Sequence, residues 1–413
     1  MAATAFIGIQ IAAPSWAGFR SNPKELVDEV WQIINRDFVD ATFNQVDWEA
    51  TRRDLLAASY ATDTEAFTAI NDALESLDDP YTRFMDPEQF ASMRIDTSGE
   101  LTGVGIQLGA DDETGLPLVV APIEDSPAFE AGIVSRDVIT AIDGTSTENM
   151  DINAAVALIR GESGTTVTLS ILRNGSEELE FTLTRTQIEL RPVRYDVRTE
   201  GGQTVGYVRL LTFSANASEY MREALEALEA ENVSGYILDL RGNPGGLLYS
   251  SAEIARMFMD SGDIVSTVNR RGVQDVLSAS NASLTDRPLV VLVDGGSASA
   301  SEILAGALQD NDRATLVGTQ TFGKGLVQSV HSLSGGAGLA VTIARYRTPN
   351  GTDIDHLGIT PDVEIELTEA DIERITADRE LLGTPADPQY AAALRSLQDA
   401  IARQAGSVVS DAR

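Results

Sequence analysis

One segment alternates short, continuously apolar runs with amphipathic stretches, and this alternation limits the possible folds more than any other feature. Between Arg191 and Glu366, strand-like runs such as GYILDL and PLVVLVD are separated by helical stretches such as SEYMREALEALEAENV. Strands that alternate with helices in this way form a largely parallel sheet covered by helices. The later runs GKGLVQSVHSL and GLAVTIARYRT predict a strand pair. We therefore expect an α/β core with a mixed sheet.

Regions of different character surround this core, so we expect an α+β multidomain chain. Apolar residues of PKELVDEVWQIINRDFV recur at helical spacing, which predicts an N-terminal helical region. Short alternating strands with one helix, MDINAAVALIRG, predict a compact, mostly β module inserted before the core. The predicted boundaries are 21–94 for the helical region, 95–187 for the inserted module, 188–370 for the core and 371–413 for a helical, acidic tail.

The first residues, 1–20, contain an apolar run that ends in the small-x-small pattern Ser15-Trp16-Ala17. This pattern is typical of the end of a secretory signal, although the usual basic residues before the apolar run are missing. The segment is interpreted either as a signal remnant or as an apolar arm packed on the body. No run reaches the roughly 18 apolar residues that a membrane-spanning helix needs.

Composition excludes several classes of function. The chain has 30 basic and 63 acidic residues, a net charge of -33, which repels nucleic-acid phosphates, so we expect no nucleic-acid partner. It contains no cysteine, which rules out a thiol nucleophile, thiolate metal ligands and disulfides. The two histidines, His331 and His356, lack the spacing of a zinc site, so we expect no metal.

Three serines alternate with alanines in DGGSASASEILAGAL, where a helix is expected to start after the strand PLVVLVD. One interpretation is structural: Ser299 and Glu302 form the S-x-x-E pattern of a helix capping box, and Ser297 or Ser301 could cap almost as well. The other is catalytic, because this loop follows a strand at the carboxyl edge of the sheet, where α/β folds bind ligands. The helix N-terminus also favours developing negative charge.

A lysine between two glycines, in TFGKGLVQ, supports the catalytic interpretation. Lys324 is one of only two lysines in the chain, the other being Lys24. A lysine acts as a general base only when neutral, so its pKa must fall from about 10.4 toward 7 to 8. Gln328, four residues later, could orient the amine or could simply be a polar strand residue.

Four motifs in this order, GYILDLRGNPGGLL, GSASASEILAGALQDNDRATLVG, TFGKGLVQ and GITPDVEI, resemble the carboxyl-terminal processing proteases. These are tail-specific Ser/Lys peptidases with an inserted PDZ domain. The resemblance implies that Ser299 is the nucleophile, Lys324 the general base and Gln328 its support. It also implies an oxyanion hole formed by the amides of Ala300 and Gly245, and it implies no metal or cofactor.

The inserted module resembles a PDZ domain in its central segment AGIVSRDVITAIDG, in which Arg136 replaces the usual glycine. The run GVGI resembles the loop whose backbone amides bind the C-terminal carboxylate of a peptide. Without the resemblance, the same run is a glycine-rich strand entry. The expected carboxylate-binding residues are Gly103, Val104, Gly105 and Ile106.

Arg160, in LIRGESG, is a candidate for coupling the PDZ domain to catalysis, and a plain surface arginine is the alternative.

The resemblance implies a serine endopeptidase that cleaves proteins or peptides with a free C-terminus near that end. The segment DDPYTRFMDPEQF resembles the photosynthetic branch, which trims the C-terminal extension of the photosystem II reaction-centre precursor. Tails of membrane proteins are thus candidate substrates, and the expected location is the thylakoid lumen or the periplasm after export. The alternatives are a general periplasmic tail-specific protease, a non-catalytic PDZ-type binding protein, and a Ser/Lys hydrolase of non-peptide acyl groups.

Overall fold

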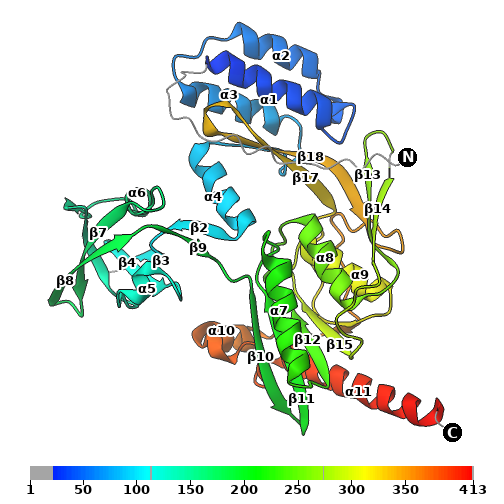
Figure 1. Cartoon of the computed structure of the whole chain (residues 1–413). Helices are drawn as coiled ribbons and strands as arrows, with labels where there is room; N and C mark the ends of the chain where they lie inside the picture. The colour runs from blue at the N-terminus through cyan, green and yellow to red at the C-terminus, as the bar shows by residue number, and fades with distance from the viewer. Residues whose placement is uncertain (1–21, 112–113, 273, 412–413) are drawn as a thin grey trace. The chain divides into compact units, whose positions relative to one another are not determined.

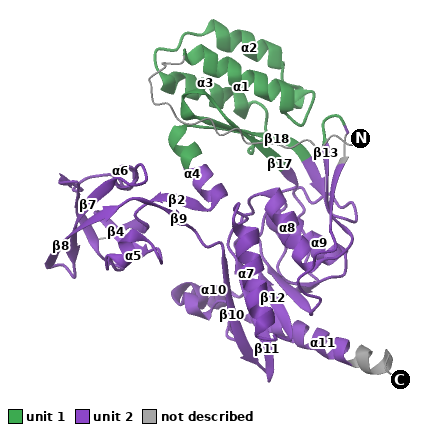
Figure 2. Cartoon of the chain, in the orientation of Figure 1, with its two compact units in different colours: residues 1–91, 269–271, 327–344 green, residues 92–268, 272–326, 345–413 purple. Residues whose placement is uncertain are grey.

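The structure, a computed structural model, describes residues 22–111, 114–272 and 274–411 (Figure 1). The predicted signal remnant or apolar arm at 1–20 lies outside these residues. The chain divides into two compact units (Figure 2). The first contains the described residues up to Ala91 together with Asn269–Arg271 and Val327–Ala344, and the second contains the remainder. No helix among the described residues is long and apolar enough to cross a membrane.

The first unit is built on amphipathic helices, which confirms the N-terminal helical region. The face predicted from the helical spacing of the first helix is buried, and Ile34 is fully enclosed. Asn22, Asp47 and Thr62 cap the first three helices through their side chains, as polar N-cap residues do. The elements are α1 (Pro23–Asp37), η1 (Phe43–Gln45), α2 (Trp48–Ala57), α3 (Asp63–Glu75), β1 (Arg83–Met85), β17 (Leu326–Ser332), η2 (Ser334–Gly336) and β18 (Gly338–Arg347).

The inserted module of the second unit is a twisted antiparallel sheet with two short helices. Its strands follow the order β3-β4-β5-β7-β8, which leaves β3 at one edge, and α6 packs against β3. Strand β2 pairs with β9 where the chain enters and leaves the module. Helix α4 (Pro87–Ser98), whose residues up to Ala91 belong to the first unit, precedes the module. The elements of the module are β2 (Glu100–Gly103), β3 (Ile106–Ala110), β4 (Pro117–Pro122), α5 (Pro127–Glu130), β5 (Val138–Ile142), β6 (Thr145–Ser146), α6 (Ile152–Ile159), β7 (Thr166–Arg173), β8 (Glu177–Thr184) and β9 (Thr186–Glu189).

The core of the second unit is a 6-stranded sheet in the order β10-β11-β12-β15-β16-β19. Figure 1 labels β10, β11, β12 and β15 of this sheet. Only β10 and β11 are antiparallel; the other neighbouring strands are parallel, which confirms the predicted mixed sheet. The strands are β10 (Val193–Glu200), β11 (Gln203–Leu210), β12 (Gly235–Asp239), β15 (Leu289–Val293), β16 (Thr315–Gly318) and β19 (Val363–Glu364), and a hairpin of β13 (Asp263–Asn269) and β14 (Gln274–Ser278) lies outside this sheet.

Helices cover the core sheet. The C-terminal helix packs on one face, where Tyr390 and Leu397 meet alternate side chains of the strands, such as Ile237 and Val290. The intervening side chains, such as Leu238 and Val291, are also buried, as the period of two along a strand requires when both faces are covered. The helices are α7 (Ala217–Ala230), α8 (Leu248–Phe258), α9 (Ala300–Asp310), α10 (Glu369–Ala377), η3 (Arg379–Leu381) and α11 (Pro388–Asp411).

The parallel arrangement determines where the loops of the core meet. Strands β12 and β15 are parallel neighbours, so their carboxyl ends, Asp239 and Val293, lie at the same edge of the sheet. The loop RGNPGG after β12 and the serine-rich turn after β15 therefore lie next to each other.

Leu397 tests how strongly α11 is bound to the sheet. Its side chain is fully buried, and its Cδ1 packs against Gly235 of β12. Leu397→Ala should lower the free energy of unfolding by roughly 2–5 kcal/mol through lost burial and the cavity left behind. Urea denaturation measures this, with exposed Arg395→Ala on the same helix as the control, for which a change within about 0.5 kcal/mol is expected. Equal effects of the two variants would contradict tight packing of α11.

Candidate active site

Ser299 occupies a sharp turn between β15 and α9. It is the residue before the first turn of the helix, and its backbone has φ 55° and ψ -111°. L-residues rarely adopt a positive φ, and such strain costs on the order of 1–3 kcal/mol, so it persists only where surrounding contacts enforce it. A strained strand-to-helix turn of this kind is how α/β hydrolases expose a nucleophilic serine. The turn thus has the geometry of a nucleophile as well as of a helix start.

The carboxylate of Glu302 holds this turn and the lysine loop together. Glu302 is fully buried. Its Oε2 accepts from the Ser299 N–H at 2.8 Å and from the Lys324 N–H at 3.0 Å. Its Oε1 accepts from the Thr321 hydroxyl at 2.6 Å and from the Gly323 N–H at 2.7 Å. These four donors match the four lone-pair positions of a carboxylate. The S-x-x-E pattern predicts only a capping role for Glu302, because it carries no information about the second loop.

The RGNPGG loop is attached to the serine turn through Asn243, which is fully buried. The Asn243 carbonyl accepts from the Ala298 N–H at 3.1 Å and from the Ser301 hydroxyl at 2.8 Å. The Ser297 hydroxyl donates to the Leu240 carbonyl at 2.8 Å. The serines on either side of Ser299 therefore bind backbone carbonyls, while Ser299 lies between them.

Gly245 lies against the serine turn. Its φ is +105°, and a Cβ there would approach Ser299 Cβ and the Ala300 nitrogen to 3.0 Å, so only glycine fits without a shift. Its N–H donates to Asn243 Oδ1 at 2.9 Å. Ala300 is the first residue of α9, where backbone N–H groups have no partner within the helix. The structure thus places both predicted oxyanion residues beside Ser299, with the Gly245 N–H directed to its own loop.

Lys324 is half-buried, and its backbone position is fixed by the packing of the glycines on either side. A Cβ at Gly323 would lie 2.9 Å from the Gly358 nitrogen, and one at Gly325 would lie 2.8 Å from the Asp355 nitrogen. The two glycines therefore let the lysine loop pack backbone to backbone on the segment 355–358.

Gln328 lies on β17, in the first compact unit, whereas Ser299 and Lys324 belong to the second. Its Nε2 donates to Thr342 Oγ1 at 3.4 Å, a contact with the neighbouring strand β18. Support of Lys324 by Gln328 stays a prediction.

The GVGI run connects β2 to the edge strand β3, and its carbonyls are anchored. The Val104 carbonyl accepts from the Ala128 N–H at 2.9 Å, and the Gly105 carbonyl accepts from the Ile123 N–H at 2.8 Å. Gly105 has φ +79°, and a Cβ there would collide with Ser126. The loop from Gly103 to Ile106 thus has a fixed shape at the start of β3.

Arg160 follows the last residue of α6, the helix that packs against β3. Its backbone N–H donates to the Val156 carbonyl at 2.9 Å and closes the helix. The side chain is half-buried, and its coupling role stays a prediction.

Comparison with known proteins gives consistent similarities. The profile of peptidase family S41 matches residues 204–365, and that of a PDZ domain matches 118–173. A carboxyl-terminal-processing protease of Synechocystis is 47% identical over 94% of this chain and 90% of its own length. The chloroplastic carboxyl-terminal-processing peptidase 2 of Arabidopsis thaliana is 44% identical over 84% of this chain and 70% of its own. The solved structure of a photosystem II D1 C-terminal processing protease is 37% identical, covers 90% of this chain and 100% of that one, and superposes with a TM-score of 0.56.

Glu302→Gln tests the link between the two loops. An amide presents one oxygen and one NH₂ group, so two of the four donors would face a donor instead of an acceptor. A shift of either loop by about 1 Å should lower kcat for peptide cleavage about 100-fold. Exposed Glu369→Gln, in the first turn of α10, is the matched control and should keep wild-type kcat. Wild-type turnover by Glu302→Gln would show that this carboxylate does not hold the site.

Proposed function

The chain belongs to peptidase family S41 and is a carboxyl-terminal-processing serine peptidase with a PDZ domain, and we propose that Ser299 is its nucleophile and Lys324 its general base. The observation that carries this proposal is the single carboxylate of Glu302, which binds the backbone N–H of both residues. The strained backbone of Ser299 supports the same role.

In the proposed reaction, neutral Lys324 takes the proton of the Ser299 hydroxyl as the oxygen attacks a peptide carbonyl near the substrate's C-terminus. The Ala300 N–H, at the start of α9, stabilises the oxyanion. Gly245 is the proposed second donor, a role that requires its N–H to leave Asn243 Oδ1. Protonated Lys324 then passes its proton to the leaving amine, and Gln328 supports the lysine amine.

Deacylation uses the same groups in reverse order. Lys324, neutral again after the amine departs, takes a proton from the water that attacks the acyl carbonyl. As the second tetrahedral intermediate collapses, protonated Lys324 returns that proton to Ser299 Oγ. The newly formed carboxyl terminus then leaves.

We propose that the loop from Gly103 to Ile106 binds the C-terminal carboxylate of the substrate through its backbone amides. Strand β3 lies at the edge of its sheet beside α6, so an extended peptide can pair with it by main-chain hydrogen bonds. Arg160, at the end of α6, is proposed to couple peptide binding to catalysis.

We further propose that the substrate is the C-terminal extension of a photosystem II D1 precursor. The basis is the similarity to a protein of that named activity and to chloroplastic processing peptidases. The corresponding location would be the thylakoid lumen or, for a general tail-specific protease, the periplasm. A purely binding protein is disfavoured because Ser299, Lys324 and Gln328 are all present.

Removing either proposed catalytic group should abolish cleavage. Ser299→Ala and Lys324→Ala should each lower kcat/KM for a peptide substrate at least about 1000-fold, because they remove the nucleophile or its base. The control is Lys24→Ala on α1, which removes the chain's other lysine and should keep full activity. Peptide cleavage followed by chromatography measures these rates. Continued cleavage by Ser299→Ala would overturn the nucleophile assignment.

Substrate selection should depend on the free C-terminus. A peptide ending in a D1 precursor tail should have a KM about tenfold lower with a free carboxylate than with an amidated end, because amidation removes charge-assisted hydrogen bonds to the loop. The comparison uses wild-type enzyme and also includes an unrelated tail of equal length. Equal KM values for the two ends would contradict recognition of the carboxylate, and preference for the unrelated tail would contradict the D1 assignment.

A further inference from the structure

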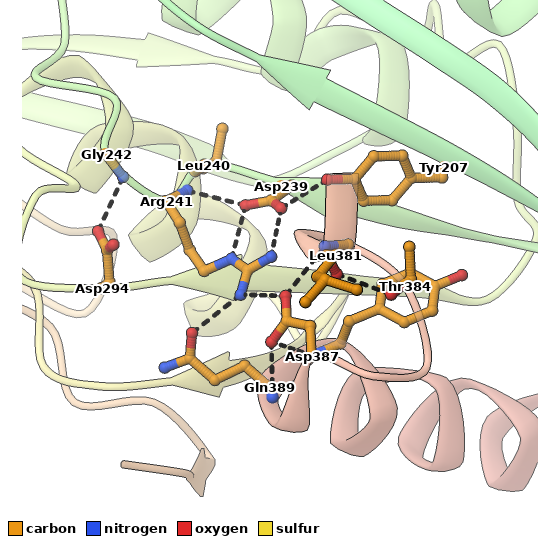
Figure 3. A network of polar contacts seen from close by, with 12 residues as sticks. Tyr207, Asp239, Leu240, Arg241, Gly242, Asp294, Leu381, Thr384, Asp387 and Gln389 are labelled. Atoms are coloured by element: carbon orange, nitrogen blue, oxygen red, sulfur yellow. Dashed lines mark hydrogen bonds and ion pairs between the residues drawn. The ribbon is translucent and has the colours of Figure 1, made fainter. Parts of the chain in front are cut away.

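A buried cluster of charged and polar side chains connects the end of β12 to the start of the C-terminal helix (Figure 3). Asp239 is the last residue of β12, Arg241 begins the RGNPGG loop, and Asp387 immediately precedes α11. Both aspartates are fully buried, and Arg241 is nearly so. The cluster thus joins segments that are far apart in the sequence.

Arg241 is held from two sides. Its Nε and Nη2 bind the two carboxylate oxygens of Asp239 at 3.0 and 2.7 Å, a bidentate pair. Its Nη1 lies 2.8 Å from Asp387 Oδ2 and donates to Gln389 Oε1 at 2.9 Å. The Tyr207 hydroxyl donates to Asp239 Oδ2 at 2.7 Å. Each of the guanidinium's three nitrogens thus contacts at least one acceptor of this cluster.

Electrostatics make the cluster sensitive to the loss of one member. Burial opposes ionisation of Asp239, but the charge and hydrogen bonds of Arg241 outweigh it and lower the Asp239 pKa. Burial likewise opposes the charge of Arg241, and the two aspartates outweigh it and raise its pKa. Removing one charge from such a set leaves the others buried and unbalanced.

Asp387 has a second task that can be separated from the first. Its Oδ1 accepts from the Gln389 N–H at 3.0 Å, as an N-cap residue of α11 does, and its Oδ2 accepts from the Gly383 N–H at 3.0 Å. Asparagine caps helices about as well as aspartate but carries no charge. An Asp387→Asn variant can therefore keep the cap on Oδ1, while an uncharged NH₂ group replaces the oxygen that faces Arg241 and the Gly383 N–H.

The cluster reaches Ser299 through the backbone on both sides of Arg241. The Leu240 carbonyl accepts from the Ser297 hydroxyl, and the Asn243 carbonyl accepts from the Ala298 N–H. The position of Arg241 thus determines where these carbonyls hold the turn that contains Ser299.

We propose that Asp387 is a positioning residue for catalysis: through Arg241, the segment before α11 fixes the 240–245 loop against the Ser299 turn. This proposal rests on the assignment of Ser299 as the nucleophile. The C-terminal segment is then part of the machinery that holds the oxyanion side of the site, in addition to covering the sheet.

The test compares the full-length enzyme with Asp387→Asn. We expect kcat to fall about 100-fold, the effect of a displacement near 1 Å, with KM within twofold of wild type. Affinity for a peptide aldehyde, which forms a tetrahedral adduct with the nucleophile, should fall by the same factor as kcat. The control is Asp47→Asn, which changes the N-cap of α2 in the same way and has its contact in the other compact unit.

Two results would overturn the proposal. One is wild-type kcat and aldehyde affinity in Asp387→Asn. The other is a loss of activity in Asp387→Asn that comes entirely from a smaller number of active sites on titration, with normal turnover per site. That result would indicate that Asp387 acts only in folding. If Asp387→Asn does not fold, the test uses Tyr207→Phe, which removes only the hydroxyl that binds Asp239. This variant should have a severalfold lower kcat and an unchanged KM. An unchanged kcat would refute the proposal. Peptide cleavage by Ser299→Ala would refute the nucleophile assignment. If Ser299→Ala is inactive and Asp387→Asn is fully active, only the positioning role of Asp387 is refuted.

Discussion

The carboxylate of Glu302 is the interaction on which the rest of the site depends. It is buried, and it accepts hydrogen bonds from two loops that follow different strands of the core sheet. Glu302 lies in the first turn of α9. Its carboxylate therefore holds three segments together: the helix, the strained Ser299 turn and the lysine loop. These contacts hold the half-buried Ser299 in its strained backbone conformation.

A second buried charge arrangement determines the position of the opposing loop. Arg241 lies between Asp239 and Asp387, and the backbone on either side of it holds the residues that flank Ser299. Glu302 connects the Ser299 turn to the lysine loop, and the loop around Arg241 binds the same turn through backbone carbonyls. The chain has a large excess of acidic residues. The contacts of Arg241 with Asp239 and Asp387 are buried rather than on the surface, and they fix the position of the backbone.

Local patterns in the sequence were sufficient to predict the core architecture and the N-terminal helices, because apolar periodicity directly reflects which faces are buried. The family motifs indicated the peptidase class and led to Ser299 and Lys324. The structure adds contacts that no local pattern encodes: Glu302 reaching Gly323, Asn243 reaching Ser301, and Asp387 reaching Arg241. The sequence predicts only a helical, acidic tail at 371–413, because the contact of Asp387 with Arg241 forms only when folding brings it to the end of β12. The hydrogen bond from the Gly245 N–H to Asn243 Oδ1 could not be predicted from the sequence either, because it depends on the conformation of the loop.

The central claim is that the strained turn presents Ser299 as the attacking group. The most direct measurement is rapid-quench mass spectrometry of wild-type enzyme mixed with a peptide bearing a free C-terminus, followed by mapping of any covalent adduct. The account predicts an acyl group on Ser299 that appears before the product and disappears as the product accumulates. The claim would be contradicted by an acyl adduct on Ser297, Ser301 or another residue. It would also be contradicted if the product formed through an acyl-enzyme in which Ser299 is not acylated.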